Sequence, residues 1–127
     1  MEYTILVILL ALLQYVWFAI RVGSARGKYN IEAPACSGDE AFDRLFRIQQ
    51  NTLEQLIVFV PSCFAFAYLV SGLWAAIVGV VFIIGRFLYA MEYTKDPKTR
   101  ALGFALTFLP NAVLLVGSLI GVGIKLF

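Results

Sequence analysis

Four long apolar stretches limit what this chain can fold into. A helix needs about 20 mostly apolar residues to cross a bilayer, and four such stretches are present, separated by polar or glycine-containing breaks. Hydrophobic residues make up 61% of the 127 residues and charged residues only 14%, against about half and a quarter in a soluble domain. We therefore expect an all-α integral membrane protein. Its helices should cover residues 3–20, 39–70, 73–93 and 98–126 and form a single four-helix transmembrane domain over residues 1–127.

Local signals indicate where these helices begin, bend and end. The segment Ser37–Glu40 has the spacing of a capping box at the start of the second helix. Pro61 predicts a kink in the middle of that helix, and Ser71–Gly72 predicts a tight turn after it. Asp96 is expected to cap the fourth helix, with Pro97 at its first helical position. No cleavage site follows the first apolar stretch, so we expect it to be a retained helix.

Two glycines of the fourth helix have the spacing of a helix contact in membranes. Gly117 and Gly121 are four residues apart, which lets small residues on one face bring two helices close together. The general tolerance of membrane helices for glycine explains the pair equally well.

Positive charge is unevenly divided between the two ends of the expected bundle. Nine of the ten cationic residues lie in or beside the loops after the first and third helices, and only Lys125 lies at the opposite end. Loops rich in arginine and lysine usually face the cytoplasm. We therefore expect the basic loops on the cytoplasmic side and both termini on the non-cytoplasmic side.

Cysteine and histidine usage argues against several kinds of chemistry. Cys36 falls in a loop and Cys63 in an apolar stretch, so the two should lie at different depths and form no disulfide. Cys63 is expected to be a small buried hydrophobic residue. Histidine is absent, which argues against haem, zinc and triad chemistry, and no metal is expected. The net charge of +2 gives no reason to expect nucleic acid as a partner.

The second helix carries a polar stripe into the membrane. Arg47, Asn51 and Glu54 lie within roughly 60° of one another on a helix, with Arg44 at the edge of the same stripe. Glu54 lies about 10 Å deeper than Arg47, too deep to reach the headgroups. Such residues are costly in lipid and usually mark a functional site. The alternative is a structural ion pair with an amide partner.

A second polar face lies at the same end of the third helix. Arg86, Tyr89 and Tyr93 are spaced by three and four residues and share one side of a helix. Arg26 and Arg100 flank this end of the bundle. Because guanidinium groups outnumber carboxylates, we expect a small ligand with several negative charges, gripped by bidentate contacts. The other cations at this end are expected to extend to the headgroups: Arg21, Lys28, Lys95 and Lys98.

These two motifs resemble those of the membrane-associated proteins in eicosanoid and glutathione metabolism, the MAPEG family. The run from Arg47 to Glu54 is similar to the signature of the family's second helix. The spacing of Arg86, Tyr89 and Tyr93, followed by Arg100, is similar to that of its third-helix signature, and Arg26 falls where the family has an arginine. The resemblance covers about residues 26–100.

The resemblance implies a homotrimer of four-helix bundles that binds glutathione between neighbouring subunits at the cytoplasmic side. It implies a set of glutathione-binding residues in this sequence: Arg26, Arg47, Gln49, Asn51, Glu54, Arg86, Tyr89 and Tyr93. Arg100 would be the catalytic residue beside the sulfur. Gln55 stands where several members have an aromatic residue, and Gly27 where some have a second arginine, which bears on the acceptor and on the ligand grip.

The expected function is that of a membrane-embedded glutathione transferase in detoxification, with peroxidase activity toward lipid hydroperoxides as an open option. Glutathione would be the co-substrate, and the partners would be a lipophilic electrophile or lipid hydroperoxide, membrane lipids and further copies of the chain. Two alternatives remain. One is a non-catalytic scaffold of the same fold that binds lipid or glutathione. The other is a small proton-coupled transporter that uses Glu54, although its basic neighbours would keep it ionised.

Overall fold

The computed structural model describes residues 1–96 and 101–127 and contains four helices in this part of the chain. They are α1 (Glu2–Tyr29), α2 (Glu40–Leu69), α3 (Gly72–Lys95) and α4 (Ala101–Leu126). Each is long and apolar enough to cross a membrane. The expected all-α, four-helix membrane architecture is therefore confirmed, while the start expected for the fourth helix at residue 98 lies outside the described residues.

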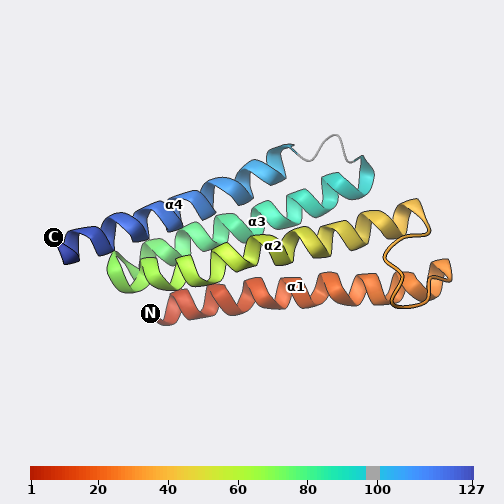
Figure 1. The fold of residues 1–127 in the computed structure, drawn as a ribbon, viewed down its shortest axis with the longest axis horizontal. Coiled ribbons are helices and arrows are strands. Elements are labelled where there is room, and N and C mark those ends of the chain that lie inside the picture. The colour runs from red at the N-terminus through yellow and green to blue at the C-terminus, as the bar shows by residue number, and fades with distance from the viewer. Residues whose placement is uncertain (97–100) are drawn as a thin grey trace.

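The helices run antiparallel in sequence order and form an elongated bundle (Figure 1). Both chain ends lie at one end of the bundle, and the loop between α1 and α2 lies at the other (Figure 1). We call this second end the loop end. Helices α2 and α3 pack on each other in the centre, with α1 and α4 against them on opposite sides. The basic loop after α1 thus lies far from both termini, as the charge pattern predicts, although which side faces the cytoplasm stays a prediction.

Helix α1 is longer than its apolar stretch. It continues past residue 20 to Tyr29 and ends at Asn30, which adopts the left-handed conformation with φ 56°. Val22 and Ala25 in this extension are buried and pack with Phe42 at the start of α2. The extension is therefore held by helix packing beyond the apolar span, which the length of that span alone does not reveal.

The expected capping box at the start of α2 was wrong in its cap residue. Asp39 is the cap, and its carboxylate accepts hydrogen bonds from the backbone N–H groups of Ala41 and Phe42. Ser37 instead donates its hydroxyl to the carboxylate of Asp43 at 3.1 Å. A carboxylate next to the first helical residue satisfies two free backbone donors and complements the helix dipole, so it prevails over the more distant serine.

A short turn joins α2 to α3, and α3 ends at Lys95. Ser71 caps α3 by accepting from the backbone N–H of Trp74 at 3.3 Å, so a tight turn does separate α2 from α3. Asp96, expected to cap the fourth helix, is the C-terminal cap of α3, and its backbone N–H donates to the carbonyl of Glu92. Pro97 lies outside the described residues. Helix α2 continues through Pro61 without interruption.

The centre of the bundle is packed by aromatic and small side chains. Phe59 and Phe82 stack with ring centroids 4.0 Å apart between α2 and α3. Cys63 is fully buried beside them, as expected, and both it and Cys36 are free thiols. Side chains on one helix donate to backbone carbonyls of another, as Thr4 does to Gly72 and Ser118 does to Ser62. These bonds satisfy polar groups that the membrane interior would leave unpaired.

Glycines allow α4 to approach its neighbours closely. A Cβ added at Gly103 would collide with the backbone of Tyr89, and one at Gly85 would lie 2.7 Å from the backbone of Leu106. A Cβ at Gly117 would lie 2.5 Å from the ring of Phe66. The expected contact role of Gly117 is thus confirmed, but the closest approach joins α3 to α4 and was not predicted.

We expect Gly103→Ala to destabilise the bundle, because the added methyl group meets backbone atoms that cannot rotate away. Gly123→Ala is the matched control, since nothing lies within 4 Å of a Cβ at that position. Thermal unfolding of both variants in the same mild detergent should show a lower midpoint for Gly103→Ala alone. Equal midpoints for the two variants would contradict the close α3–α4 contact.

Candidate functional site

The α2 stripe, formed by Arg47, Asn51 and Glu54, lies on the outside of the bundle. Arg47 and Glu54 are exposed, and Asn51 is half-buried. Within residues 1–96 and 101–127, neither Arg47 nor Glu54 forms an ion pair. The structural ion-pair interpretation therefore has no support within the described chain. The stripe presents two opposite charges and an amide to whatever covers this face.

The depth of Glu54 makes its exposure significant. Fifteen residues separate it from Leu69 at the far end of α2, which corresponds to about 22 Å of helix. Because the hydrocarbon core is about 30 Å thick, Glu54 lies within it rather than at the headgroups. A carboxylate that faces acyl chains at this depth is costly, so it needs a partner other than the residues that the structure describes.

Arg86 lies inside the bundle and not on the outer stripe. It is fully buried, and its guanidinium donates to the hydroxyl oxygens of Thr52 at 2.7 Å and Thr107 at 3.4 Å. Each threonine hydroxyl in turn donates to a carbonyl of its own helix, those of Ile48 and Gly103. The hydroxyl lone pairs are thus free to accept from the guanidinium. Arg86 therefore joins α2, α3 and α4 at one level of the bundle.

Tyr89 and Tyr93 continue from Arg86 toward the loop end. Their rings stack with centroids 5.5 Å apart, and the Arg86 guanidinium carbon lies 4.5 Å from the centre of the Tyr89 ring. They pack with Phe18 of α1 and Ile48 of α2. The two tyrosines thus occupy the space between α1, α2 and α3, about one turn (Tyr89) and two turns (Tyr93) from the buried arginine toward the loop end.

Gln49 and Arg26 are engaged on the side of α2 that faces α1. Gln49 donates to the hydroxyl of Tyr15 at 3.4 Å. Arg26 donates to the carbonyl of Ala35 at 2.7 Å and lies over the ring of Phe42. Within one protomer, therefore, the predicted glutathione-binding residues form three groups: the outer α2 stripe, the internal Arg86 and tyrosine column, and the α1 side. Arg100 lies outside the described residues.

Sequence reasoning missed three polar residues that organise this region. Thr52 and Thr107 hold Arg86, and Asn111 of α4 donates to the side-chain oxygen of Gln55 at 3.1 Å. Gln55, noted as a departure from the resembled family, is thus turned toward α4. The signal that could have found them is the buried charge itself, since an arginine in an apolar helix requires acceptors on the helices around it.

Comparison with known proteins places these features in a family. The family model described as the MAPEG family matches residues 4–120, which extends the resemblance into α1 and α4. An uncharacterized protein of Synechocystis sp. is 43% identical over 117 residues, which are 92% of this chain and 85% of that protein. Human microsomal glutathione S-transferase 2 is 37% identical over 87% of this chain and 76% of its own length. Rat leukotriene C4 synthase is 29% identical over 74% and 63% of the two lengths.

The match covers nearly the whole chain, including the segments that carry both polar motifs, and it agrees with the four membrane-spanning helices. This four-helix membrane protein belongs to the MAPEG family.

Proposed function

We propose that this protein is a membrane-embedded glutathione transferase whose glutathione sites lie between neighbouring subunits near the loop end. The observation that carries the proposal is the α2 stripe, whose Arg47 and Glu54 face outward at membrane depth with no ion-pair partner in the described chain. The names of two relatives, a microsomal glutathione S-transferase and a leukotriene synthase, support it at the level of the family.

The charges of the α2 stripe match those of glutathione. The tripeptide carries two carboxylates, one ammonium group and a thiol. Arg47 offers a planar pair of donors for a carboxylate, and Glu54 offers a carboxylate for the ammonium group. Asn51 lies between these two charges on the same stripe, and its side-chain oxygen accepts no hydrogen bond from any described residue. A ligand of this composition would neutralise both exposed charges at once.

The same exposure favours an oligomer, which we propose to be a homotrimer. A single protomer leaves the α2 stripe open to lipid, and its Arg26 and Gln49 lie on the α1 side of α2. A second subunit docked on the outer face of α2 would cover the stripe and bring its own α1 side to it. The site would then combine Arg47, Asn51 and Glu54 of one subunit with residues of the next. The loop end would face the cytoplasm.

Arg86 serves this site from within the bundle. It is fully buried and supports the Tyr89 ring, so we assign it the role of positioning Tyr89 and Tyr93 beside the ligand. Because threonines on α2 and α4 hold the guanidinium of Arg86, the arginine and the tyrosine ring stacked on it keep a fixed position along the bundle axis. The tyrosine hydroxyls would then supply further contacts to the tripeptide.

The proposed chemistry needs one cation near the sulfur and no metal. A thiol with a pKa of about 8.5 is mostly protonated at pH 7, and a neighbouring positive charge lowers the pKa and favours the thiolate. We assign that charge to Arg100. The thiolate would then attack a lipophilic electrophile that reaches the site through the bilayer, or reduce a lipid hydroperoxide.

The transporter alternative fits less well. A proton-coupled carrier needs its carboxylate on a path through the bundle, whereas Glu54 faces outward from α2. A non-catalytic scaffold is compatible with the same geometry, and turnover of an electrophile separates it from the proposed enzyme.

Arg47→Ala and Glu54→Gln should each weaken glutathione binding while leaving helix content unchanged. A hydrogen bond to a charged group contributes about 1.5–3 kcal/mol, so each variant should raise Kd by roughly ten- to a hundredfold. Calorimetry of the solubilised protein measures this. Lys125→Gln, which removes a charge at the opposite end of the bundle, is the control and should bind normally. Normal affinity in both stripe variants would mean that the stripe does not bind glutathione.

Mixed oligomers test whether one site uses two subunits. Chains carrying Arg26→Ala and chains carrying Glu54→Gln should each bind poorly alone, because each lacks one half of every site. When the two are co-expressed, some boundaries combine an intact Arg26 with an intact Glu54, and binding should partly return. Mass measurement in mild detergent checks that trimers form and that they are mixed. Verified mixed trimers without recovery would contradict a shared site.

Replacing Arg100 with alanine should lower turnover much more than it weakens glutathione binding, because the charge acts on the thiolate and the transition state. The pKa of the bound thiol should rise toward its ordinary value, so thiolate absorbance should develop at higher pH than in the wild type. Arg100→Lys should restore part of both effects, since a point charge remains. Superimposable titrations with equal turnover would remove Arg100 from the mechanism.

A further inference from the structure

Two cations of α1 line a pocket at the loop end, beside the start of α2. The pocket has a volume of about 270 Å³, and its lining includes Arg21, Ser24 and Lys28 of α1 and Leu45 of α2. The three polar residues are spaced by three and four positions, so they share one side of the helix. Arg21 is half-buried, and Ser24 and Lys28 are exposed, so a molecule in the pocket can reach all three. The pocket thus combines two positive charges with a hydroxyl donor.

Neither cation is neutralised by the protein. Within the part of the chain that the structure describes, Arg21 and Lys28 form no ion pair. The guanidinium carbon of Arg21 lies 5.1 Å from the centre of the Trp17 ring, and the ammonium nitrogen of Lys28 lies 5.3 Å from that of Tyr29. The face of a ring attracts a cation but leaves its charge uncompensated. The pocket is therefore complementary to an anion.

The position of this pocket in the membrane indicates which anions it meets. Arg21 lies nineteen residues after Glu2, which corresponds to about 28 Å of helix. In a hydrocarbon core about 30 Å thick, this places Arg21 at the edge of the core. Lys28 lies about 10 Å further along the axis and thus among the headgroups. The anions concentrated in that layer are the phosphates of lipids.

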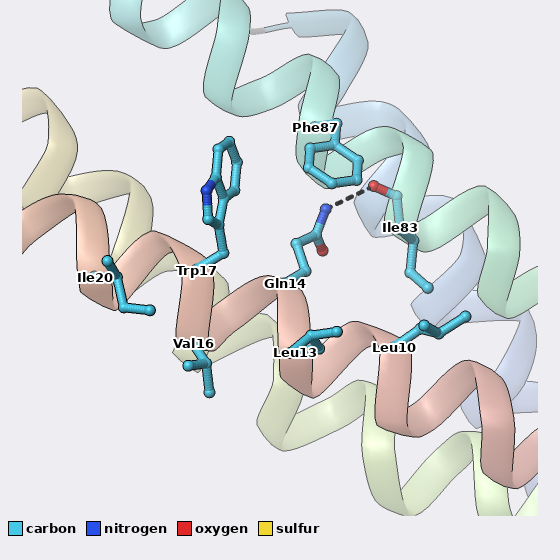
Figure 2. Close-up of a pocket in the computed structure, with 8 residues that line it drawn as sticks. All are labelled: Leu10, Leu13, Gln14, Val16, Trp17, Ile20, Ile83 and Phe87. Carbon is cyan, nitrogen blue, oxygen red and sulfur yellow. Dashed lines mark hydrogen bonds between the residues drawn. The ribbon is translucent and has the colours of Figure 1, made fainter.

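An apolar groove continues from the pocket toward the termini. It has a volume of about 570 Å³ and runs between α1 and α3, and Ile20 lines both the pocket and the groove. From Ile20 the groove passes between Trp17 and Phe87 and extends to Leu10 (Figure 2). Ten residues of helix correspond to about 15 Å, which is the thickness of one leaflet of the hydrocarbon core. The groove therefore has the length of an acyl chain whose headgroup lies at the pocket.

We propose that the pocket binds the phosphate of an anionic phospholipid whose acyl chain follows the groove between α1 and α3. Arg21 and Lys28 pair with the phosphate oxygens, and the hydroxyl of Ser24 donates to one of them. A zwitterionic headgroup such as phosphocholine carries an ammonium group that the two cations repel, so the pocket prefers phosphatidylglycerol to phosphatidylcholine. No residue of the α2 stripe lines the pocket or the groove, so the lipid binds without glutathione.

Fluorescence of Trp17 can report which lipid occupies the groove. The chain has two tryptophans, and Trp74→Phe leaves Trp17 as the sole emitter. In bilayers of phosphatidylcholine with brominated acyl chains, the bromine atoms should quench Trp17 of this full-length protein. Adding unbrominated phosphatidylglycerol should restore fluorescence more than the same fraction of unbrominated phosphatidylcholine. The affinities should differ roughly ten- to thirtyfold, because each cation near the surface favours an anionic lipid by about fivefold. Both leaflets have one composition, so the orientation of the protein does not matter.

Variants in the Trp74→Phe background separate the pocket from the general surface charge. Lys28→Gln removes one pocket cation without touching Trp17 and should lower the preference about fivefold. Combining it with Arg21→Gln should abolish the preference, with fluorescence normalised to that in unbrominated lipid. Lys95→Gln is the matched control, because it removes an exposed cation at the same end of the bundle but outside the pocket, and it should keep the preference.

Three results would each overturn the proposal. Equal affinities of the two lipids in the Trp74→Phe protein would show that the pocket does not select an anionic headgroup. An unchanged preference in the variant that lacks both pocket cations would place the selection elsewhere. An equal loss in Lys95→Gln and Lys28→Gln would mean that the lipid responds to the charge of the whole surface and not to this pocket.

Discussion

The core of a bilayer cannot solvate a charge, and this constraint decides how the helices of this bundle meet. Arg86 meets it in part and without a carboxylate in the described chain, because two of its guanidinium nitrogens donate to the hydroxyls of Thr52 and Thr107 while its buried Nε finds no acceptor among the described residues. Each threonine donates to a carbonyl of its own helix and accepts from the guanidinium, so no hydroxyl proton is left over. Three helices are therefore held in one register by a single cation. Removing either threonine would leave a buried donor unpaired and would loosen that register.

Helix α2 meets the same constraint differently on its two faces. Its inner face carries Thr52 and Gln55, which find partners on α3 and α4. Its outer face carries Arg47 and Glu54, which have no ion-pair partner in the described chain. Anything that covers the outer face, whether a second subunit or a charged ligand, lowers the free energy of the assembled state relative to the protomer alone. Assembly and ligand binding are therefore expected to stabilise one another.

Periodicity and apolar length predicted the number of helices and the polar stripe of α2, but neither the outward direction of that stripe nor the contacts between helices. Thr52 and Thr107, like Gly85 and Gly103, come from distant parts of the chain, and no spacing within one helix reveals which residues will face each other. The position of Gln49 was available from the sequence: two residues after Arg47 it is turned by about 200° and faces another side. The resemblance groups Gln49 with Arg47, Asn51 and Glu54 in one set of glutathione-binding residues, whereas helical geometry turns it toward α1.

Amide side chains in this bundle show a bias that follows from helical backbone chemistry. Beyond the first turn every helical N–H is already used within its helix, whereas a carbonyl oxygen can accept a second hydrogen bond. The NH₂ groups of Gln14 and Asn111 accordingly find carbonyls on neighbouring helices. Their side-chain oxygens find no donor in the described chain. An amide buried in a membrane helix bundle is thus biased to leave its oxygen without a partner, and the hydrogen bond that its NH₂ group donates offsets only part of that cost.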